Sequence, residues 1–365
     1  MARLNRIASL DGVRALAALS VMVFHFVALF GRQYPGWLRQ ASVPGQTGVD
    51  LFFVLSGFLI TRILLETAGR DGYYRAFYAR RILRIFPLYF AYLGIHFFLL
   101  PLVLDARIPA FREQVWSWLF LENVAQTFPA LGSEGPNHYW SLAVEEHFYL
   151  MWPFVVASCN RRTLLRIIGG ILLLSPVLRF VLASRGYGVF YLTPTRLDGL
   201  SLGAGIAIVL ADRQEAPGWM VPLSRTLCLA LPVLLLPLFV EFSGSGDALL
   251  QAVKLSLIPL FYAAFVALCL ADGTFAPVRR ILEAHWLRWV GGISYGLYVF
   301  HPACFRIVAR FFPAIPLPGT ILLAFGLSFL SAWASFRWFE SRFLSLKRYF
   351  TLPSHPRSEG AHAQH

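Results

Sequence analysis

Long apolar stretches alternate with short polar segments along nearly the whole chain. A helix that crosses a bilayer needs about 20 mostly apolar residues, and these stretches have about that length. They are continuous, whereas the strands of a membrane β-barrel alternate between polar and apolar residues. The pattern predicts an all-α, polytopic transmembrane helical bundle with about ten spans, at residues 10–30, 47–66, 85–104, 138–157, 164–183, 196–212, 225–242, 253–271, 289–311 and 317–338.

The composition supports a membrane protein. Of the 365 residues, 57% are hydrophobic and 14% are charged. A soluble protein carries about 25% charged residues, so this chain lacks the charge to cover a water-facing surface. The high apolar content also excludes intrinsic disorder for most of the chain. The four cysteines stand singly without a C-x-x-C pair, and we therefore expect no metal site and no tightly bound cofactor.

The charge balance indicates the topology. The chain has 32 Lys and Arg against 19 Asp and Glu, a net charge of +13. In a soluble protein this excess would suggest a nucleic-acid partner, but here most of the basic residues lie between spans. If the N-terminus is cytoplasmic, most of them face the cytoplasm, as the positive-inside rule requires. We therefore expect both termini to be cytoplasmic, a membrane domain over residues 1–345 and a polar, disordered tail over 346–365.

Ionisable residues inside the spans are costly, so each is a candidate functional residue. Arg14 and His25 lie eleven residues apart on the first span, close to three full turns. They therefore share one helix face and are separated by about 16 Å along the axis. Glu145 and Glu146 are expected at the depth of His25, in the outer half of their span. Adjacent residues point about 100° apart, so at most one of the two carboxylates can face a given site.

Further polar residues are expected at two depths. Arg80, Arg81 and Arg84 lie with Arg14 on the cytoplasmic side. An outer group is expected to line a polar cavity, although Arg196 could equally form a structural ion pair with Asp50 or Asp198. Basic groups inside with His and Glu outside suggest a ligand with an anionic head in the cytosol and chemistry above it. The outer group comprises Asp50, His138, Trp140, Ser141, Arg196, Asp198, Tyr298 and His301.

Six motifs occur in order over about residues 9–340, and each is weak alone. They are Leu10-Asp11-Gly12-Val13-Arg14 with His25, the segment 48–60 (GVDLFFVLSGFLI), the segment 80–89 (RRILRIFPLY), His138-Tyr139-Trp140-Ser141-Leu142 with Glu145-Glu146, Arg196-Leu197-Asp198-Gly199-Leu200, and the segment 292–298 (GISYGLY) with His301. On these motifs the chain resembles the acyltransferase-3 family of bacterial integral-membrane acyltransferases.

The resemblance implies an acyl-CoA-dependent O-acyltransferase of the bacterial cytoplasmic (inner) membrane. Such an enzyme moves an acyl group, usually acetyl, from cytosolic acyl-CoA to a hydroxyl of a cell-surface or exported glycan, such as a polysaccharide or lipopolysaccharide. The partners implied are membrane lipid, acyl-CoA and the glycan acceptor. Some members carry an additional extracytoplasmic hydrolase-like domain, and we expect a stand-alone member here because the chain ends soon after the last predicted span. The acceptor and the oligomeric state stay open.

The two depths suggest a division of roles. Arg14 and the group Arg80, Arg81 and Arg84 would bind the CoA phosphates. Ser294 and Tyr295 are further candidates for donor binding. The pantetheine arm would then bring the thioester to His25, which acts as general base on the acceptor hydroxyl or carries the acyl group covalently.

Supporting groups are expected around His25 and the thioester. Glu145 or Glu146 would orient the imidazole, as the carboxylate of a hydrolase triad does. Arg14, Tyr298 or Ser294 could polarise the thioester carbonyl. A transporter or flippase that uses the same intramembrane residues as its path is the alternative of another class. A non-catalytic assembly or sensor protein with the same fold is a third reading.

Overall fold

The computed structural model describes residues 7–31, 35–211, 213, 215–241, 247–271 and 275–352. Within these ranges the protein is helical and contains no β-strand. The all-α prediction is therefore confirmed. The ten longest helices are α1 (Ala8–Phe30), α3 (Gly48–Thr67), α4 (Tyr73–Gly94), α8 (Trp140–Ser158), α9 (Arg161–Ser184), α10 (Leu197–Leu210), α11 (Met220–Glu241), α12 (Ala248–Leu270), α14 (His285–Phe311) and α15 (Leu317–Ser335).

Shorter helical segments connect or extend these ten. Two of them are π-helical, namely η3 (Ile95–Leu99) after α4 and η7 (Phe336–Glu340) after α15. The remaining segments are the α-helices α2 (Gly36–Ser42), α5 (Leu100–Leu104), α6 (Phe111–Trp118), α7 (Glu122–Thr127), α13 (Ala276–Leu282) and α16 (Ser341–Ser345), and the 3-10 turns η2 (Val43–Thr47), η4 (Pro129–Leu131), η5 (Asn137–Tyr139), η6 (Thr193–Thr195) and η8 (Leu346–Phe350).

Nine of the ten predicted spans correspond mainly to one long helix each, while the span predicted at 85–104 covers the second half of α4 with η3 and α5. The helices differ in how apolar they are. Among the described residues, seven continuous helical stretches are long and apolar enough to cross a membrane. α10 is apolar but has only 14 residues. α8 and α14 are not among the seven, and they carry Glu145, Glu146 and His301. The chain is thus a multi-pass membrane protein, while ten spans and cytoplasmic termini stay predictions.

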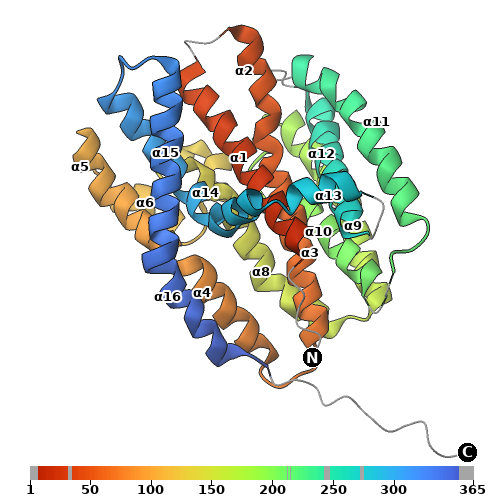
Figure 1. Ribbon diagram of the computed structural model, residues 1–365. Coiled ribbons are helices and arrows are strands. Elements are labelled where there is room, and N and C mark those ends of the chain that lie inside the picture. The colour runs from red at the N-terminus through yellow and green to blue at the C-terminus, as the bar shows by residue number, and fades with distance from the viewer. Residues whose placement is uncertain are drawn as a thin grey trace, which may run out of the picture.

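The helices are arranged around α1 and α3. α1 packs against α14 and α3, and α3 packs along α10. In Figure 1, α16 runs beside α4 and α15 packs against α14 on one side of the bundle, whereas α11 lies at the opposite edge against α12. Residues far apart in sequence, such as those of α1 and α14, therefore meet in the middle of the bundle.

Glycines permit close crossings of α3 with α10 and of α1 with α14. A Cβ atom on Gly203 of α10 would overlap the carbonyl oxygen of Val54 on α3. A Cβ atom on Gly291 of α14 would likewise overlap the carbonyl oxygen of Asp11 on α1. Small residues allow such backbone approach in membrane bundles, where van der Waals packing drives association. The second crossing sets α14 against the same helix that carries Arg14 and His25.

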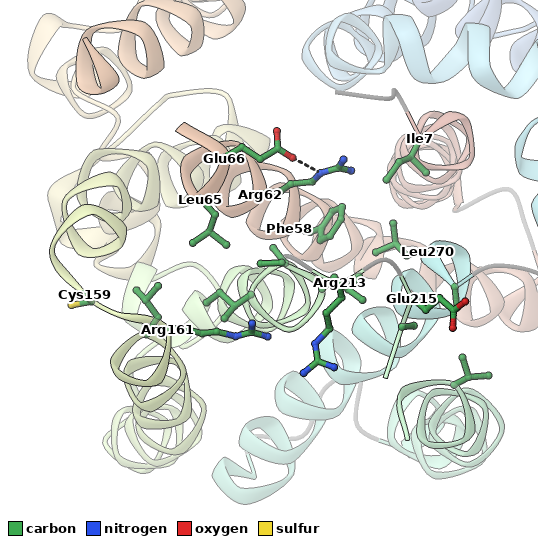
Figure 2. A pocket seen from close by; sticks show the side chains of 18 residues that line it. Ile7, Phe58, Arg62, Leu65, Glu66, Cys159, Arg161, Arg213, Glu215 and Leu270 are labelled. Carbon is green, nitrogen blue, oxygen red and sulfur yellow. Dashed lines mark hydrogen bonds and ion pairs between the residues drawn. The ribbon is translucent and has the colours of Figure 1, made fainter. Parts of the chain in front are cut away.

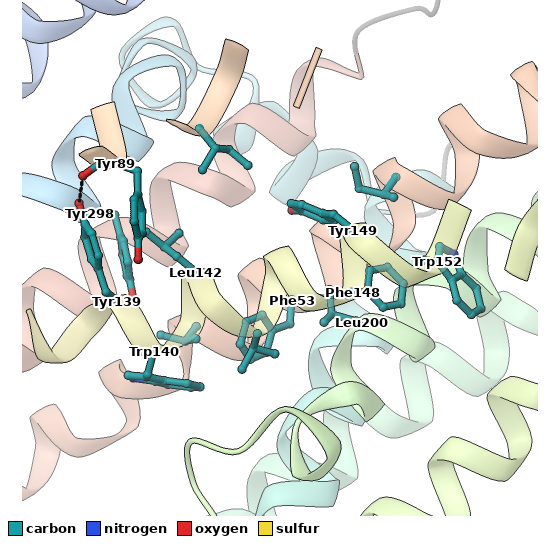
Figure 3. Packing of buried hydrophobic residues seen from close by; sticks show 14 of the residues in the cluster. Phe53, Tyr89, Tyr139, Trp140, Leu142, Phe148, Tyr149, Trp152, Leu200 and Tyr298 are labelled. Atoms are coloured by element: carbon teal, nitrogen blue, oxygen red, sulfur yellow. Dashed lines mark hydrogen bonds between the residues drawn. The ribbon is translucent and has the colours of Figure 1, made fainter. Parts of the chain in front are cut away.

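Aromatic side chains fill the interior around α8. Figure 3 shows them along this helix from Trp140 to Trp152, with Tyr89 and Tyr139 together near one end. The rings of Tyr89 and Tyr139 stack with centroids 4.5 Å apart. The Trp152 indole donates a hydrogen bond of 2.8 Å to the Thr61 hydroxyl. This packing fixes the rotation of α8 and so decides which way its carboxylates point.

The predicted tail begins later than the sequence suggests. Residues 346–350 form the turn η8, which packs against α4. The basic side chains of Lys347 and Arg348 lie in this turn. The rest of the predicted tail, residues 353–365, lies outside the described residues, so its predicted disorder stays a prediction.

Candidate active site

The central feature is a pair of histidines on α1 and α14. Nδ1 of His25 lies 2.8 Å from Nε2 of His301, and the two rings stack at an interplanar angle of 17°. His301 is fully buried, and its Nδ1 lies 2.9 Å from the Leu297 carbonyl oxygen on the preceding turn. The close crossing of α1 and α14 brings these residues together, although they are 276 positions apart in the sequence.

A network of buried polar groups continues from the histidine pair. The His138 ring lies 5.6 Å from the His301 ring, measured between centroids. The Tyr298 hydroxyl donates to the His138 carbonyl oxygen at 2.7 Å and lies 2.5 Å from the Ser141 hydroxyl. His138, Ser141, Tyr298 and His301 were predicted to share the outer group, and the structure brings these four together.

A cavity of about 220 Å³ lies next to this network. Arg14, Arg81 and Arg84 contribute its guanidinium groups, while Ser141 and Tyr298 connect it to the histidines. Ser294 and Tyr295 also line it, as do apolar side chains of α3. Arg80 is not among the lining residues, so three of the four predicted phosphate-binding arginines share this cavity. The cavity thus joins these basic groups to the hydroxyls of Ser141 and Tyr298, whereas His25 and His301 are not among its lining residues.

The arginines of the cavity differ in how they are compensated. Arg14 forms an ion pair of 2.8 Å with the buried carboxylate of Asp11, while its own side chain stays 34% exposed. The guanidinium of Arg84 lies 5.9 Å from the centre of the Tyr295 ring. Asp11 was not among the predicted site residues, although its spacing of three residues from Arg14 on a helix is typical of such a pair.

Lys347 is a basic neighbour of the cavity that the sequence did not indicate. It lies within electrostatic range of Arg80, Arg81 and Arg84 because η8 packs against α4. The sequence placed Lys347 in a disordered tail, where no position relative to α4 could be expected. The basic cluster at this end of the cavity is thus larger than predicted, and it favours anionic ligands.

The two carboxylates of α8 have different surroundings from those expected. Glu145 lines the cavity beside the hydroxyls of Ser56 and Tyr149, within electrostatic range of Arg14 and Arg81. Glu146 is not among the residues that line the cavity, and its Oε1 is a buried atom without a hydrogen-bond partner among the described residues. The partner of the His25 Nδ1 is His301 and not a carboxylate. The contact at Nδ1 is thus made by α14, which packs against α1, while α8 packs against α3; an orienting role of Glu145 or Glu146 stays a prediction.

Two candidates for polarising the carbonyl are already engaged. The Ser294 hydroxyl donates to the Gly291 carbonyl oxygen at 2.8 Å, and the Tyr298 hydroxyl donates to that of His138. A hydroxyl has one proton to donate. Each must therefore leave its backbone acceptor before it can donate to a substrate, whereas Arg14 has several N–H groups.

The remaining predicted residues form a separate ion-pair cluster. Arg196 donates to Asp50 at 2.6 Å, and Arg179 donates to Asp198 at 2.7 Å. All four side chains are at most 6% exposed. The Arg196 guanidinium also lies within 6 Å of the rings of Phe53, Trp140 and Phe190. Arg196 therefore forms the ion pair that was one of its two expected roles. Asp50, Trp140 and Asp198 lie in this cluster and not in the cavity.

A second cavity, of about 890 Å³, opens elsewhere in the bundle (Figure 2). Arg62, Arg161 and Arg213 line it together with Glu66 and Glu215. Arg62 pairs with Glu66 at 3.0 Å, as the dashed line in Figure 2 marks. Cationic and anionic side chains are mixed here, and the histidine pair does not contribute to its lining.

No cluster of three or more His, Cys, Asp or Glu side chains that could hold a metal ion is found among the residues that the structure describes. The site itself presents imidazole, hydroxyl, carboxylate and guanidinium groups. Such groups support proton transfer and binding of anions.

Comparison with known proteins gives independent evidence of the family to which the chain belongs. A family described as an acyltransferase domain matches residues 7–337. The chain is 33% identical over 320 residues to YrhL of Bacillus subtilis, named as a candidate peptidoglycan O-acetyltransferase, covering 81% of this chain and 48% of that protein. It is 30% identical over 361 residues to the peptidoglycan O-acetyltransferase OatA of Listeria monocytogenes, covering 91% of this chain and 55% of that protein.

The chain thus spans about half the length of these curated relatives. A candidate O-acetyltransferase of Staphylococcus aureus is 25% identical over 364 residues, with 93% of this chain and 58% of that protein covered. No solved structure matches the chain significantly.

Proposed function

The chain belongs to the acyltransferase-3 family, and we propose that it transfers an acetyl group from cytosolic acetyl-CoA to a hydroxyl of a cell-wall glycan. Its place would be the bacterial cytoplasmic membrane, with donor and acceptor reaching the site from opposite sides. The observation that carries this proposal is the cavity that extends from Arg14, Arg81 and Arg84 to the hydroxyls beside the histidine pair. The acceptor class rests on the peptidoglycan O-acetyltransferases to which the chain is similar.

The basic end of the cavity suits the phosphates of the donor. Three guanidinium groups line it, with Lys347 and Arg80 nearby, against one lining carboxylate at Glu145. Guanidinium groups bind phosphate through paired, charge-assisted hydrogen bonds. The 34% exposure of the Arg14 side chain would leave part of that group accessible to a ligand.

The separation of Arg14 and His25 along α1 suits the arm of the donor. α1 is continuous from Ala8 to Phe30, so Arg14 and His25 lie about 16 Å apart along it. This separation is about the length of a pantetheine arm. Phe52, Leu55 and Leu59 of α3 line the cavity together with Arg14 and can pack against the arm.

His25 would act as the general base. The step begins when a ring nitrogen of His25 takes the proton of the acceptor hydroxyl, and the oxygen bonds to the carbonyl carbon of the thioester. The C–S bond then breaks, its electron pair stays on the CoA sulfur, and the proton passes from His25 to that sulfur. A positioned base of this kind contributes about 10²- to 10⁴-fold to the rate.

The test uses the full chain, purified and reconstituted in proteoliposomes with radiolabelled acetyl-CoA and soluble peptidoglycan fragments. Wild type should produce a base-labile labelled ester on the glycan, and His25→Ala should lose transfer by at least about 10²-fold. Membrane insertion and the elution profile of the variant should be unchanged. Normal transfer by His25→Ala would overturn the proposed base.

The same vesicles test the transporter alternative. A transporter or flippase would move labelled glycan across the membrane without any acyl-CoA and would leave no ester on it. Movement of this kind in wild type, together with absence of ester formation, would refute the acyltransferase proposal.

The covalent alternative is distinguished by a rapid quench in the absence of acceptor. With His25 as base, the protein should retain no stoichiometric labelled acetyl group after denaturation at neutral pH. A labelled adduct that His25→Ala lacks would replace general-base catalysis by an acyl-His intermediate.

A further inference from the structure

The contact between His25 and His301 defines which ring nitrogen of His25 is basic. Nδ1 of His25 and Nε2 of His301 are 2.8 Å apart, a normal hydrogen-bond distance. Between two neutral imidazoles, one nitrogen must donate a proton and the other must accept it. The direction of this bond depends on the second nitrogen of each ring.

The second nitrogen of His301 settles the direction. His301 Nδ1 lies 2.9 Å from the Leu297 carbonyl oxygen, which can only accept a hydrogen bond. His301 Nδ1 must therefore carry a proton, and in the neutral ring Nε2 then holds the lone pair. The opposite tautomer would place a lone pair against the carbonyl oxygen in a fully buried position, which is costly.

The proton positions on His25 follow from this bond. His301 Nε2 accepts, so His25 Nδ1 carries the proton and donates it. The lone pair of His25 is then on Nε2, the ring nitrogen on the other side from His301. We propose that His301 is a positioning residue that holds His25 in the tautomer with a basic Nε2, an inference that rests on the proposed function.

The surroundings of His301 make it suited to hold another ring in place. His138, Tyr298 and Phe305 surround the ring, with centroids 5.6, 6.0 and 5.6 Å from it. The ring is thus fixed by packing on several sides and by one backbone hydrogen bond. Support of this kind is what keeps a reacting group within its productive geometry.

His301 would exchange no proton during the reaction. His25 Nε2 takes the hydroxyl proton as the acceptor oxygen bonds to the thioester carbon. The proton then leaves Nε2 for the sulfur as the C–S bond breaks. Throughout, Nδ1–H of His25 donates to His301 Nε2. This hydrogen bond stabilises the imidazolium that forms transiently at His25. A carboxylate in a hydrolase triad has the same positioning role, and here a neutral imidazole would supply it.

Two amide substitutions separate this role from mere packing. In His301→Gln the amide oxygen can reach the former position of Nε2 and accept from His25. In His301→Asn the amide reaches only the former position of Nδ1, where it can donate to Leu297 but not contact His25. His301→Phe keeps the ring and removes both polar contacts.

The measurement is steady-state acetyl transfer by the full chain in proteoliposomes, with acetyl-CoA varied. We expect kcat of His301→Asn and His301→Phe to fall by roughly 10²-fold, the lower part of the range for general-base catalysis. His301→Gln should stay within about tenfold of wild type. KM for acetyl-CoA should not change in any of the three, because His301 does not line the arginine cavity. Equal kcat values for the Gln and Asn variants would overturn the inference, as would losses confined to KM.

A second readout does not depend on turnover. In protein labelled with 15N-histidine, the 15N shifts distinguish protonated from unprotonated ring nitrogens, and His25→Gln identifies the His25 signals. Wild type should show His25 protonated on Nδ1 alone, and His301→Phe should show a mixture of tautomers. If wild type transfers acetyl and His25→Ala does not, while His25 shows Nε2–H in wild type, only the positioning role fails. If wild type makes no ester, the proposed function fails, and the NMR measurement still tests the tautomer.

Discussion

Two clusters of charged side chains lie within the bundle, and they differ in how their charges are compensated. In the cluster of Arg179, Asp198, Arg196 and Asp50, each cation has a carboxylate within 2.7 Å and every side chain is at most 6% exposed. In the cavity, Arg14 has an ion pair with Asp11, whereas Arg81 and Arg84 have none among the described residues, and Glu145 is the one carboxylate in the lining. Both clusters would be costly in a bilayer without compensation. The comparison suggests that an incompletely paired, open cluster binds a ligand, whereas a paired and closed one holds helices together.

The largest effect on stability is expected when the paired cluster is broken. Asp50→Ala leaves the Arg196 cation buried without its carboxylate, which should destabilise the protein by about 3–5 kcal/mol. The thermal unfolding midpoint in nanodiscs measures this loss. The double substitution Asp50→Leu with Arg196→Met should recover most of it, because replacing both partners by apolar residues removes the buried charge.

This prediction also tests the division between the clusters. If Asp50→Ala unfolds at the wild-type temperature but loses acetyl transfer, the pair belongs to the reaction. The comparison would then be wrong, and the original expectation that Asp50 and Arg196 border an acceptor cavity would hold.

The next effect is expected on donor affinity. Arg81→Gln and Arg84→Gln each remove a charged donor, and a hydrogen bond to a charged group contributes about 1.5–3 kcal/mol. KM for acetyl-CoA should therefore rise about tenfold or more for each, since 1.4 kcal/mol corresponds to tenfold. The unfolding midpoint should change little. Arg62→Gln is the matched control, because Arg62 lines the other cavity and pairs with Glu66. A similar rise of KM in Arg62→Gln would show that the proposed assignment of the donor to the arginine cavity is wrong.

The smallest effect is expected at the exposed pair of Arg107 and Glu113, 2.7 Å apart. The hydrogen bond from Arg107 lowers the pKa of the Glu113 carboxyl from its ordinary value. The pair therefore stabilises the fold above that ordinary pKa, and the contribution is lost as the pH falls through the lowered pKa. Exposed pairs contribute little, so Arg107→Ala should leave transfer unchanged and shift the unfolding midpoint only slightly at neutral pH. This shift of the unfolding midpoint should disappear in acid. If Arg107→Ala instead lost acetyl transfer, the loop that carries Arg107 and Glu113 would have a role in catalysis.

The fold could be predicted well from the sequence because apolar length is a local property. Nine of the ten predicted spans coincide with one long helix each, including α8 and α14, which carry polar residues; the tenth, 85–104, covers the second half of α4 with η3 and α5. The π-helical segments η3 and η7 could not be expected, since nothing in their composition distinguishes them from α-helix. The helical turn at residues 346–350, which were expected to be disordered, could not be foreseen either, because the packing of η8 against α4 is a tertiary contact.

The candidate site could be predicted only in part, for a related reason. Helical periodicity gives the direction of a side chain relative to its own helix, so Arg14 and His25 could be placed on one face. It does not give the rotation of one helix against another. Whether His25 meets Glu145 on α8 or His301 on α14 therefore depends on crossings such as that of Gly291 with Asp11. The same limit explains why Arg196 could be assigned equally to a cavity or to an ion pair.

The most direct test of the arginine cavity as donor site is the binding of acetyl-CoA to the purified His25→Ala chain, measured by isothermal titration calorimetry in nanodiscs. The variant cannot complete the reaction, so the titration reports binding alone. We predict one saturable site with the affinity of wild-type protein, and binding at least about tenfold weaker when Arg81→Gln and Arg84→Gln are added. Binding that is undiminished by the arginine substitutions, or absent in both proteins, would contradict the assignment of the cavity to acyl-CoA.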